Sequence, residues 1–236
     1  MLPTGCGSGV SAGESLPAPV WHEFKDQTGV ELIDGIGSTE NFHIFISNRP
    51  GDLRPGSSGK PVPGYECRIV DTDGAVVPPG DIGNLQVKGE TAALSYLHDA
   101  ERSRTTFLGD WLHTGDKYYE DEDGYFWHAG RTDDMLKVGG IWVSPVEVES
   151  TLLAHPAVLE AAVVGITDQS DLVKPKAYLI LNEGYAGSDE LTAELVAYCK
   201  EKMADYKRPR WVEYVDELPK TATGKIQRFR LRTESD

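Results

Sequence analysis

Apolar and polar residues alternate along the middle of the chain, between about residues 50 and 129. In the run 65–70, for example, tyrosine, cysteine and isoleucine alternate with glutamate and arginine, a period of two that is typical of half-buried strands. The runs are separated by turn sequences at 71–74 and 78–81, which are rich in Asp, Pro and Gly. The pattern predicts a small antiparallel sheet or barrel over this region.

Before this region, residues 15–29 have the pattern of an amphipathic helix. Val20, Trp21 and Phe24 give it an apolar face, Ser15 is the predicted N-cap, and Gly29 is the predicted end. A short apolar strand is expected over residues 30–36, immediately followed by the polar turn Gly37-Ser38-Thr39-Glu40.

The last hundred residues have the pattern of a compact α+β unit, in which helices and short apolar strands alternate. Helix 188–204 has apolar residues at every fourth position, as expected for a helix with one buried face. The other expected elements are a short helix at 146–154 and strands at 161–166, 177–181 and 211–215.

The stretch Gly130–Glu147 separates the two patterns. It begins with several charged residues, continues with Gly139-Gly140, and closes with Ser144 and Pro145, a helix-starting pair. Such a junction is typical of a hinge or an interdomain site, although a linker followed by an ordinary strand has the same pattern.

The composition fits a soluble globular protein of 236 residues, with 39% hydrophobic and 26% charged residues. No apolar run is long enough to cross a membrane, and the first residues lack the features of a signal peptide. The three cysteines, Cys6, Cys67 and Cys199, are widely spaced, which favours a reducing, cytoplasmic environment over a disulfide framework or a zinc site.

The net charge of −15 argues against binding to nucleic acid or to an anionic membrane. However, eight basic and three acidic residues lie between Lys207 and Arg232. This basic segment either docks on the acidic body of the chain or serves a small anion, such as a nucleotide phosphate.

Three short motifs suggest nucleotide chemistry. The hydroxyls of the 37–40 turn suit phosphate, and Glu40 suits Mg²⁺; a plain polar turn is the alternative. Asp116, in Thr114-Gly115-Asp116, can accept two hydroxyl protons of a sugar, or it belongs to an Asx turn. Lys225 is expected on a mobile loop at 219–226, which lacks the spacing of a Walker phosphate loop.

Taken in order with Gly130-Arg131-Thr132-Asp133-Asp134, these motifs resemble those of the acyl-adenylate-forming superfamily, which contains acyl-CoA synthetases, adenylation domains and firefly-type luciferases. Within it the chain most resembles benzoate–CoA ligases. The stretches that carry this resemblance are residues 37–48, 111–117 and 142–149.

The resemblance implies an α/β and α+β multi-domain fold. Residues 1–130 would be the C-terminal portion of the large nucleotide- and acyl-binding domain, with a β-rich subdomain at about 50–129 that forms its small β-barrel. Residues 131–236 would be the compact, mobile α+β C-terminal domain, with its hinge near Asp133. The first half of the large domain, which carries the phosphate loop, has no counterpart here, so a missing N-terminal portion of the same enzyme is an implied partner.

The resemblance also implies ATP-dependent activation of an aromatic, benzoate-like acid to an acyl-AMP, with Mg²⁺, followed by transfer to coenzyme A. For the first step, the implied residues serve the nucleotide, the metal and the acid. They are Gly13, Glu14 and Ser15 at the adenine, Thr39 at phosphate, Glu40 at the metal, Asp116 and Arg131 at the ribose, Lys225 at the α-phosphate, and Gly37, His43 and Ile44 in the acyl pocket.

For the thiol step, the implied residues lie in the stretch after the hinge. They are Lys137 as a second catalytic lysine, with Gly139, Gly140 and Trp142 along the coenzyme A channel. A buried core histidine is the alternative for His43. Two other functions remain open, namely an adenylation domain that loads a carrier protein and a non-catalytic nucleotide-binding or interaction module.

Overall fold

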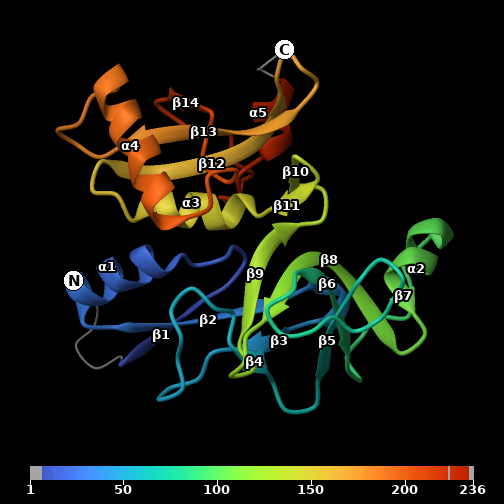
Figure 1. Ribbon diagram of the computed structural model, residues 1–236. Helices are drawn as coiled ribbons and strands as arrows, with labels where there is room; N and C mark the ends of the chain where they lie inside the picture. Colours follow the sequence, from blue (N-terminus) through green and yellow to red (C-terminus); the bar gives the residue numbers. More distant parts are fainter. Residues whose placement is uncertain (1–6, 223, 234–236) are drawn as a thin grey trace. The chain divides into compact units, whose positions relative to one another are not determined.

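The computed structural model describes residues 7–222 and 224–233, and side chains up to Arg232. The chain forms two compact units, the first ending at Thr132 and the second beginning at Asp133. Figure 1 shows the elements of each unit. Among the described residues, no helix is both long and apolar enough to span a bilayer.

The first unit contains a four-stranded sheet in the order β1-β2-β3-β4, in which β1 runs parallel to β2 and the other pairs are antiparallel. Helix α1 (Ala18–Thr28) connects the two parallel strands, as a parallel pair requires. The strands are β1 (Ser8–Ser11), β2 (Glu31–Gly37), β3 (Ile44–Ser47) and β4 (Lys60–Pro61).

The predicted start of α1 is wrong. Ser15 does not cap this helix; Pro17 is the N-cap residue, and no side chain satisfies the first amides. The helix is held instead from its apolar face, where the indole of buried Trp21 donates to the Leu32 carbonyl at 2.7 Å. The predicted end is confirmed, because Gly29 adopts the left-handed conformation with φ 72°.

A five-stranded antiparallel sheet follows, which confirms the expectation from the alternating pattern. Its order is β5-β6-β8-β7, and β9 pairs with β8. Buried Phe45 and Ile46 of β3 pack with Ile69, Leu85 and Val87 of this sheet in one apolar cluster. The elements are β5 (Glu66–Val70), β6 (Gly83–Lys88), α2 (Ala100–Thr106), β7 (Phe107–Leu108), β8 (Trp111–Glu120) and β9 (Phe126–Arg131).

The second unit is a three-stranded sheet with helices on its two faces (Figure 1). Residues of α3 and α4 pack with Ala161 and Val163, whereas Leu231 of α5 packs with Ala162 and Val164. Both faces are thus buried, which explains why residues 161–166 form a continuous apolar run. The elements are α3 (Pro145–Leu153), β12 (Val158–Thr167), β13 (Val173–Leu181), α4 (Asp189–Lys202), β14 (Trp211–Tyr214) and α5 (Arg228–Thr233).

The helix starts predicted in this unit are confirmed. The Ser144 hydroxyl accepts from the Glu147 amide at 3.0 Å, and Pro145 is the first residue of α3. In α4 the apolar residues at fourfold spacing face the core, with Leu195 and Cys199 fully buried. Before α3 the chain forms a hairpin of β10 (Leu136–Val138) and β11 (Ile141–Val143).

The division into units predicts a protease-sensitive site. Arg131, Thr132 and Asp133 are exposed, as is the Gly139-Gly140 turn of the hairpin. Limited proteolysis, mapped by mass spectrometry, is expected to cut first between residues 130 and 140 and to leave two resistant fragments. A first cut elsewhere, with this segment resistant, would contradict the assignment of the junction.

Candidate functional site

The turn after β2 is shaped by residues that have no alternative there. A side chain at Gly37 would place its Cβ 2.7 Å from the His43 carbonyl oxygen, so only glycine fits. The Ser38 hydroxyl accepts from the Asn41 amide at 3.3 Å and caps a short 3₁₀ turn, Thr39–Asn41. The pairing of β2 with β3 places Gly37 opposite Ile44, which directly follows His43.

His43 is exposed in the described part of the chain. Beside it, Phe42 is 83% exposed and has a positive φ of 68°. An exposed aromatic side chain on strained backbone is more typical of a binding surface than of a packed core.

Glu40 is held by neighbours that the sequence alone did not identify. The Tyr96 hydroxyl donates to its carboxylate at 2.6 Å, and the Arg102 guanidinium lies 3.9 Å away while stacking on the Tyr96 ring. Burial alone would raise the pKa of Glu40, but the hydrogen bonds from Tyr96 and Ser38 and the charge of Arg102 lower it overall. The carboxylate is thus ionised at neutral pH.

A single ionised carboxylate fits a Mg²⁺ ion that is bound mainly through the phosphates of a nucleotide. Among the described residues, no cluster of three or more His, Cys, Asp or Glu side chains could hold a metal by itself. The side chain of Glu40 keeps 23% of its surface exposed, so it remains accessible to a bound ligand.

Asp116 and Arg131 face each other because β8 and β9 pair in that register. The guanidinium donates to the Asp116 carboxylate at 2.9 Å and to the Thr114 carbonyl at 3.2 Å. Burial would raise the pKa of Asp116, yet His128 and Arg131 lower it overall. The structure therefore presents a largely buried, anionic carboxylate beside an exposed guanidinium.

The loop that contains Gly13, Glu14 and Ser15 connects β1 to α1, and Asp34 lies on the neighbouring strand opposite Ser11. Asp34 is buried, and one of its oxygens, Oδ1, has no hydrogen-bond partner. Burial raises the pKa of Asp34 to about 7, although hydrogen bonds from the Leu16 and Gly35 amides and the Ser11 hydroxyl oppose the shift.

In the second unit, the expected thiol-step residues lie on the β10–β11 hairpin. Lys137 and Trp142 are directly opposite each other, with the ammonium 5.6 Å from the indole centroid. Gly139 and Gly140 form the two-residue turn with φ of 57° and 87°, a conformation that favours glycine at both positions. Trp142 is 53% exposed.

Lys225 is exposed at the end of a hydrogen-bonded turn. The Lys225 amide donates to the Thr221 hydroxyl at 3.0 Å, and its carbonyl accepts from the Thr221 amide at 2.8 Å. Lys220 pairs with Glu160 of β12 at 2.5 Å. The segment expected to be a mobile loop makes hydrogen bonds within the turn and an ion pair to the sheet; Thr223 lies outside the described residues.

A cavity of about 200 Å³ in the second unit is lined by three cationic side chains that belong to none of the sequence motifs. Arg208 is oriented by an ion pair with Asp205 at 2.8 Å. Two of the three cations, Arg208 and Arg210, lie in the basic segment between Lys207 and Arg232. The lining residues are Val138, Lys174, Pro175, Asp205, Tyr206, Arg208 and Arg210.

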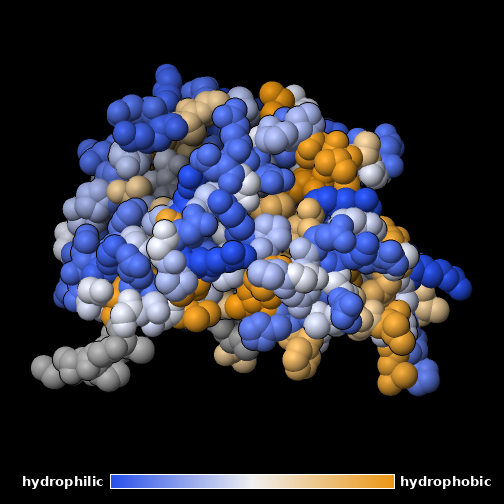
Figure 2. Space-filling view, turned by 90° about the horizontal axis from the view of Figure 1, so that it is seen from below, coloured by the Kyte–Doolittle hydropathy of each residue, from blue (hydrophilic) through white to orange (hydrophobic). Residues whose placement is uncertain are grey.

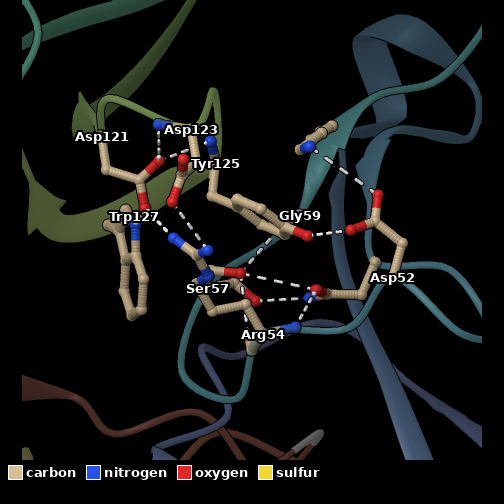
Figure 3. A network of polar contacts seen from close by, with 10 residues as sticks. Asp52, Arg54, Ser57, Gly59, Asp121, Asp123, Tyr125 and Trp127 are labelled. Atoms are coloured by element: carbon tan, nitrogen blue, oxygen red, sulfur yellow. Dashed lines mark hydrogen bonds and ion pairs between the residues drawn. The ribbon is translucent and has the colours of Figure 1, made fainter.

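A polar network supports the first unit next to the five-stranded sheet (Figure 3). Arg54 pairs with Asp121 at 2.8 Å and with Asp123 at 2.9 Å, and its guanidinium stacks on Tyr125. The Trp127 indole donates to Asp121 at 2.9 Å. These contacts join the loop between β3 and β4 to the β8–β9 hairpin, and that hairpin carries Asp116 and Arg131.

The fold and the family matches together define the class of adenylate-forming enzymes. Residues 4–97 match the model of the family described as "AMP-binding enzyme", and residues 147–225 match that of the "AMP-binding enzyme C-terminal domain". The chain belongs to the AMP-binding enzyme family and corresponds to the C-terminal portion of its members.

The relatives include acid–CoA ligases, which confirms the resemblance to benzoate–CoA ligases. A benzoate–CoA ligase of Thauera aromatica is 54% identical over 224 residues, which are 94% of this chain and 42% of that protein. An anthranilate CoA ligase whose structure was solved in complex with anthranoyl-AMP is 65% identical, with a TM-score of 0.95. The match covers 98% of this chain and 45% of the ligase chain.

A benzoate CoA ligase from Burkholderia xenovorans LB400 is 51% identical, with a TM-score of 0.90, over 95% of this chain and 45% of its own. The chain therefore spans less than half the length of these relatives.

The environment of Asp34 predicts a pH-dependent stability. Its pKa in the folded protein lies above the ordinary 3.8, so the folded protein binds this proton more tightly than the unfolded chain does. The resulting stability is fully present below pH 3.8 and is lost as the pH rises through about 7. Replacement by asparagine should remove up to about 1.4 kcal/mol per pH unit of this slope.

The measurement is urea unfolding of the parent and Asp34→Asn proteins between pH 5 and pH 8. Asp26→Asn, on the exposed side of α1, is the matched control. Parallel stability curves for the parent and the Asp34 variant would show that Asp34 is ionised in the folded protein throughout this range.

Proposed function

We propose that this chain is part of an ATP-dependent, AMP-forming ligase that joins an aromatic, benzoate-like acid to coenzyme A. The observation that carries the proposal is the ionised Asp116 beside Arg131, in a chain 65% identical to a ligase whose structure contains anthranoyl-AMP. A carboxylate of this kind can accept hydrogen bonds from both hydroxyls of a ribose, and the guanidinium keeps it anionic.

In the first step, the substrate carboxylate attacks the α-phosphate of ATP and pyrophosphate leaves. Asp116 and Arg131 would hold the ribose, Gly13-Glu14-Ser15 would lie at the adenine, and Thr39 would contact phosphate. Bound Mg²⁺, held by Glu40, would neutralise charge on the phosphates. The Lys225 ammonium would stabilise the charge that develops on the α-phosphate during attack.

The acid itself would lie beside the turn after β2. Gly37 allows the His43–Ile44 backbone to pack closely against it, and the exposed His43 and half-buried Ile44 flank it. Their combination of a flat polar ring and an aliphatic side chain suits an aromatic acid better than a long aliphatic chain.

In the second step, the thiol of coenzyme A attacks the acyl-adenylate and AMP leaves. For this step the second unit would rotate about Asp133, so that Lys137, Gly139, Gly140 and Trp142 face the substrate. Glycines at the hairpin turn allow a narrow chain such as pantetheine to approach the backbone. The cavity with Lys174, Arg208 and Arg210 has the charge needed for the phosphates of coenzyme A.

Features of the first unit support a further polypeptide as its partner, corresponding to the N-terminal portion of the relatives. Strand β1 ends the order of its sheet, and Phe42, Leu94 and Leu97 are 83%, 95% and 86% exposed. Figure 2 shows apolar groups on an otherwise largely hydrophilic face of the molecule. An edge strand and exposed apolar side chains are typical of a surface that another polypeptide covers.

The first test uses the 236-residue chain by itself. Because its sequence contains no Gly-rich phosphate loop, we expect little formation of benzoyl-adenylate, measured as exchange of labelled pyrophosphate into ATP with benzoate present. Adding the N-terminal portion of a relative should restore exchange. Exchange by the chain alone at the rate of an intact ligase would refute the need for this partner.

The second test concerns Lys225 in the complete ligase. Lys225→Ala should slow adenylation roughly 10²–10³-fold, because this charge acts mainly in the transition state. Preformed benzoyl-adenylate and coenzyme A should still give thioester at nearly the parent rate. Lys200→Ala, an exposed lysine of α4, is the control. Equal losses in both half-reactions would mean that Lys225 has only a structural role.

A further inference from the structure

A cluster of ion pairs in the second unit joins its first two residues to the helix that follows Lys225. Arg228 and Arg232 of α5 contribute the positive charges, and Asp134 and Glu149 contribute the negative ones. These residues are widely separated in the sequence, so the cluster is a product of the fold.

The pair between Arg228 and Glu149 anchors this cluster in the core. Arg228 Nε and Nη2 donate to the two carboxylate oxygens at 3.1 and 2.8 Å, and the Val163 amide of β12 donates at 2.8 Å. Glu149 is buried, with 7% of its surface exposed. Burial raises the pKa of Glu149, and Arg228 opposes the shift. Displacement of α5 would remove Arg228 and leave the Glu149 carboxylate buried without a positive partner, which is energetically costly.

The same helix holds the beginning of the unit. Arg232 Nη2 contacts the Asp134 carboxylate at 2.5 Å and donates to the Asp133 carbonyl at 3.2 Å. Arg228 Nη1 adds a longer contact to Asp134 at 3.8 Å. The backbone of the second unit is therefore fixed from the Asp133 carbonyl onward.

The end of the first unit is fixed just as closely. The Thr132 amide and hydroxyl both donate to the Gly115 carbonyl, at 3.0 and 3.1 Å. The preceding Arg131 is bonded to Asp116. The Thr132 amide and the Asp133 carbonyl are both hydrogen-bonded. The backbone torsions between these two groups belong to Thr132 and Asp133.

The two residues between Lys225 and α5 are held by packing and by a hydrogen bond. Ile226 packs against the apolar cluster that includes Leu218 and Leu231. The Gln227 amide donates to the Pro219 carbonyl at 2.8 Å, immediately before Arg228. Displacement of α5 would consequently disturb the packing of Ile226 and the hydrogen bond of Gln227, and with them the turn that contains Lys225.

We propose that Arg228 and Arg232 are positioning residues that make the Asp133–Asp134 backbone and the Lys225 turn one rigid body. The inference rests on the roles proposed above for Asp133 and Lys225. Through α5, loosening of the Asp133–Asp134 backbone is thereby transmitted to the Lys225 turn, although the two segments are far apart in the sequence.

The test is hydrogen exchange, read by mass spectrometry, on the 236-residue chain. Asp134→Asn removes a charge that pairs with Arg228 and Arg232 of α5, and Arg232→Ala removes the closer of these two partners. Both should raise exchange roughly tenfold or more in residues 133–138 and also in residues 219–228. Lys207→Ala is the matched control, since it breaks an ion pair with Glu147 at 2.7 Å elsewhere in this unit.

Exchange in the central strands β12 and β13 should stay at the parent rate, which shows that the unit remains folded. Arg232→Lys should restore part of the protection. If Asp134→Asn loosens residues 133–138 but leaves residues 219–228 at the parent rate, or if Lys207→Ala loosens both, the proposed coupling is overturned.

Activity separates this inference from the proposed function. In the complete ligase, Arg232→Ala should lower the rate of both half-reactions while the KM for ATP changes little, because each step requires a defined orientation. If Lys225→Ala leaves adenylation unchanged, the proposed role of Lys225 fails, whereas the exchange experiment still decides whether the two segments are coupled.

Discussion

The buried carboxylate of Glu149 is the constraint on which the second unit depends. A charged group in an apolar core requires a partner of opposite charge and satisfied hydrogen bonds, and removing one partner typically costs about 3–5 kcal/mol. The Arg228 guanidinium and the Val163 amide meet this requirement. Because Arg228 begins α5, satisfying one carboxylate of α3 also fixes the helix that follows Lys225.

Local sequence signals predicted much of this fold. The cap at Ser144, the left-handed Gly29 and the fourfold spacing in α4 each depend on residues within one or two turns of each other. The Ser15 cap failed because the helix begins only at Ala18, with Pro19 in its first turn, where proline is well tolerated. Strand β1 and helix α5 were not predicted at all: the first is a short run of small residues, and the second is a short basic segment without an apolar period.

In the candidate site, too, local sequence signals were predictive and long-range contacts were not. Motifs predicted which residues to consider, and strand register alone brings Asp116 opposite Arg131. The partners that hold these residues could not be predicted, because Tyr96 is 56 residues from Glu40 and Arg228 is 79 residues from Glu149. No local pattern marks such pairs, and they arise only when separate elements pack. The hydrogen bonds of the Lys225 turn were not predicted either, because a Thr- and Gly-containing segment after a proline reads as a loop when its partners are unknown.

Charge is distributed between the two units in a way that suits the proposed chemistry. The chain as a whole carries a net charge of −15, yet the second unit presents Lys137, Lys225 and the cationic cavity. The first unit instead offers ionised Glu40 and Asp116. Groups that bind a nucleotide's metal and hydroxyls can stay in place through both steps, whereas a cation that stabilises attack on phosphate is needed in only one. Under the proposed mechanism, placing Lys137 and Lys225 on a separate unit would let the same nucleotide meet a different cation in each step.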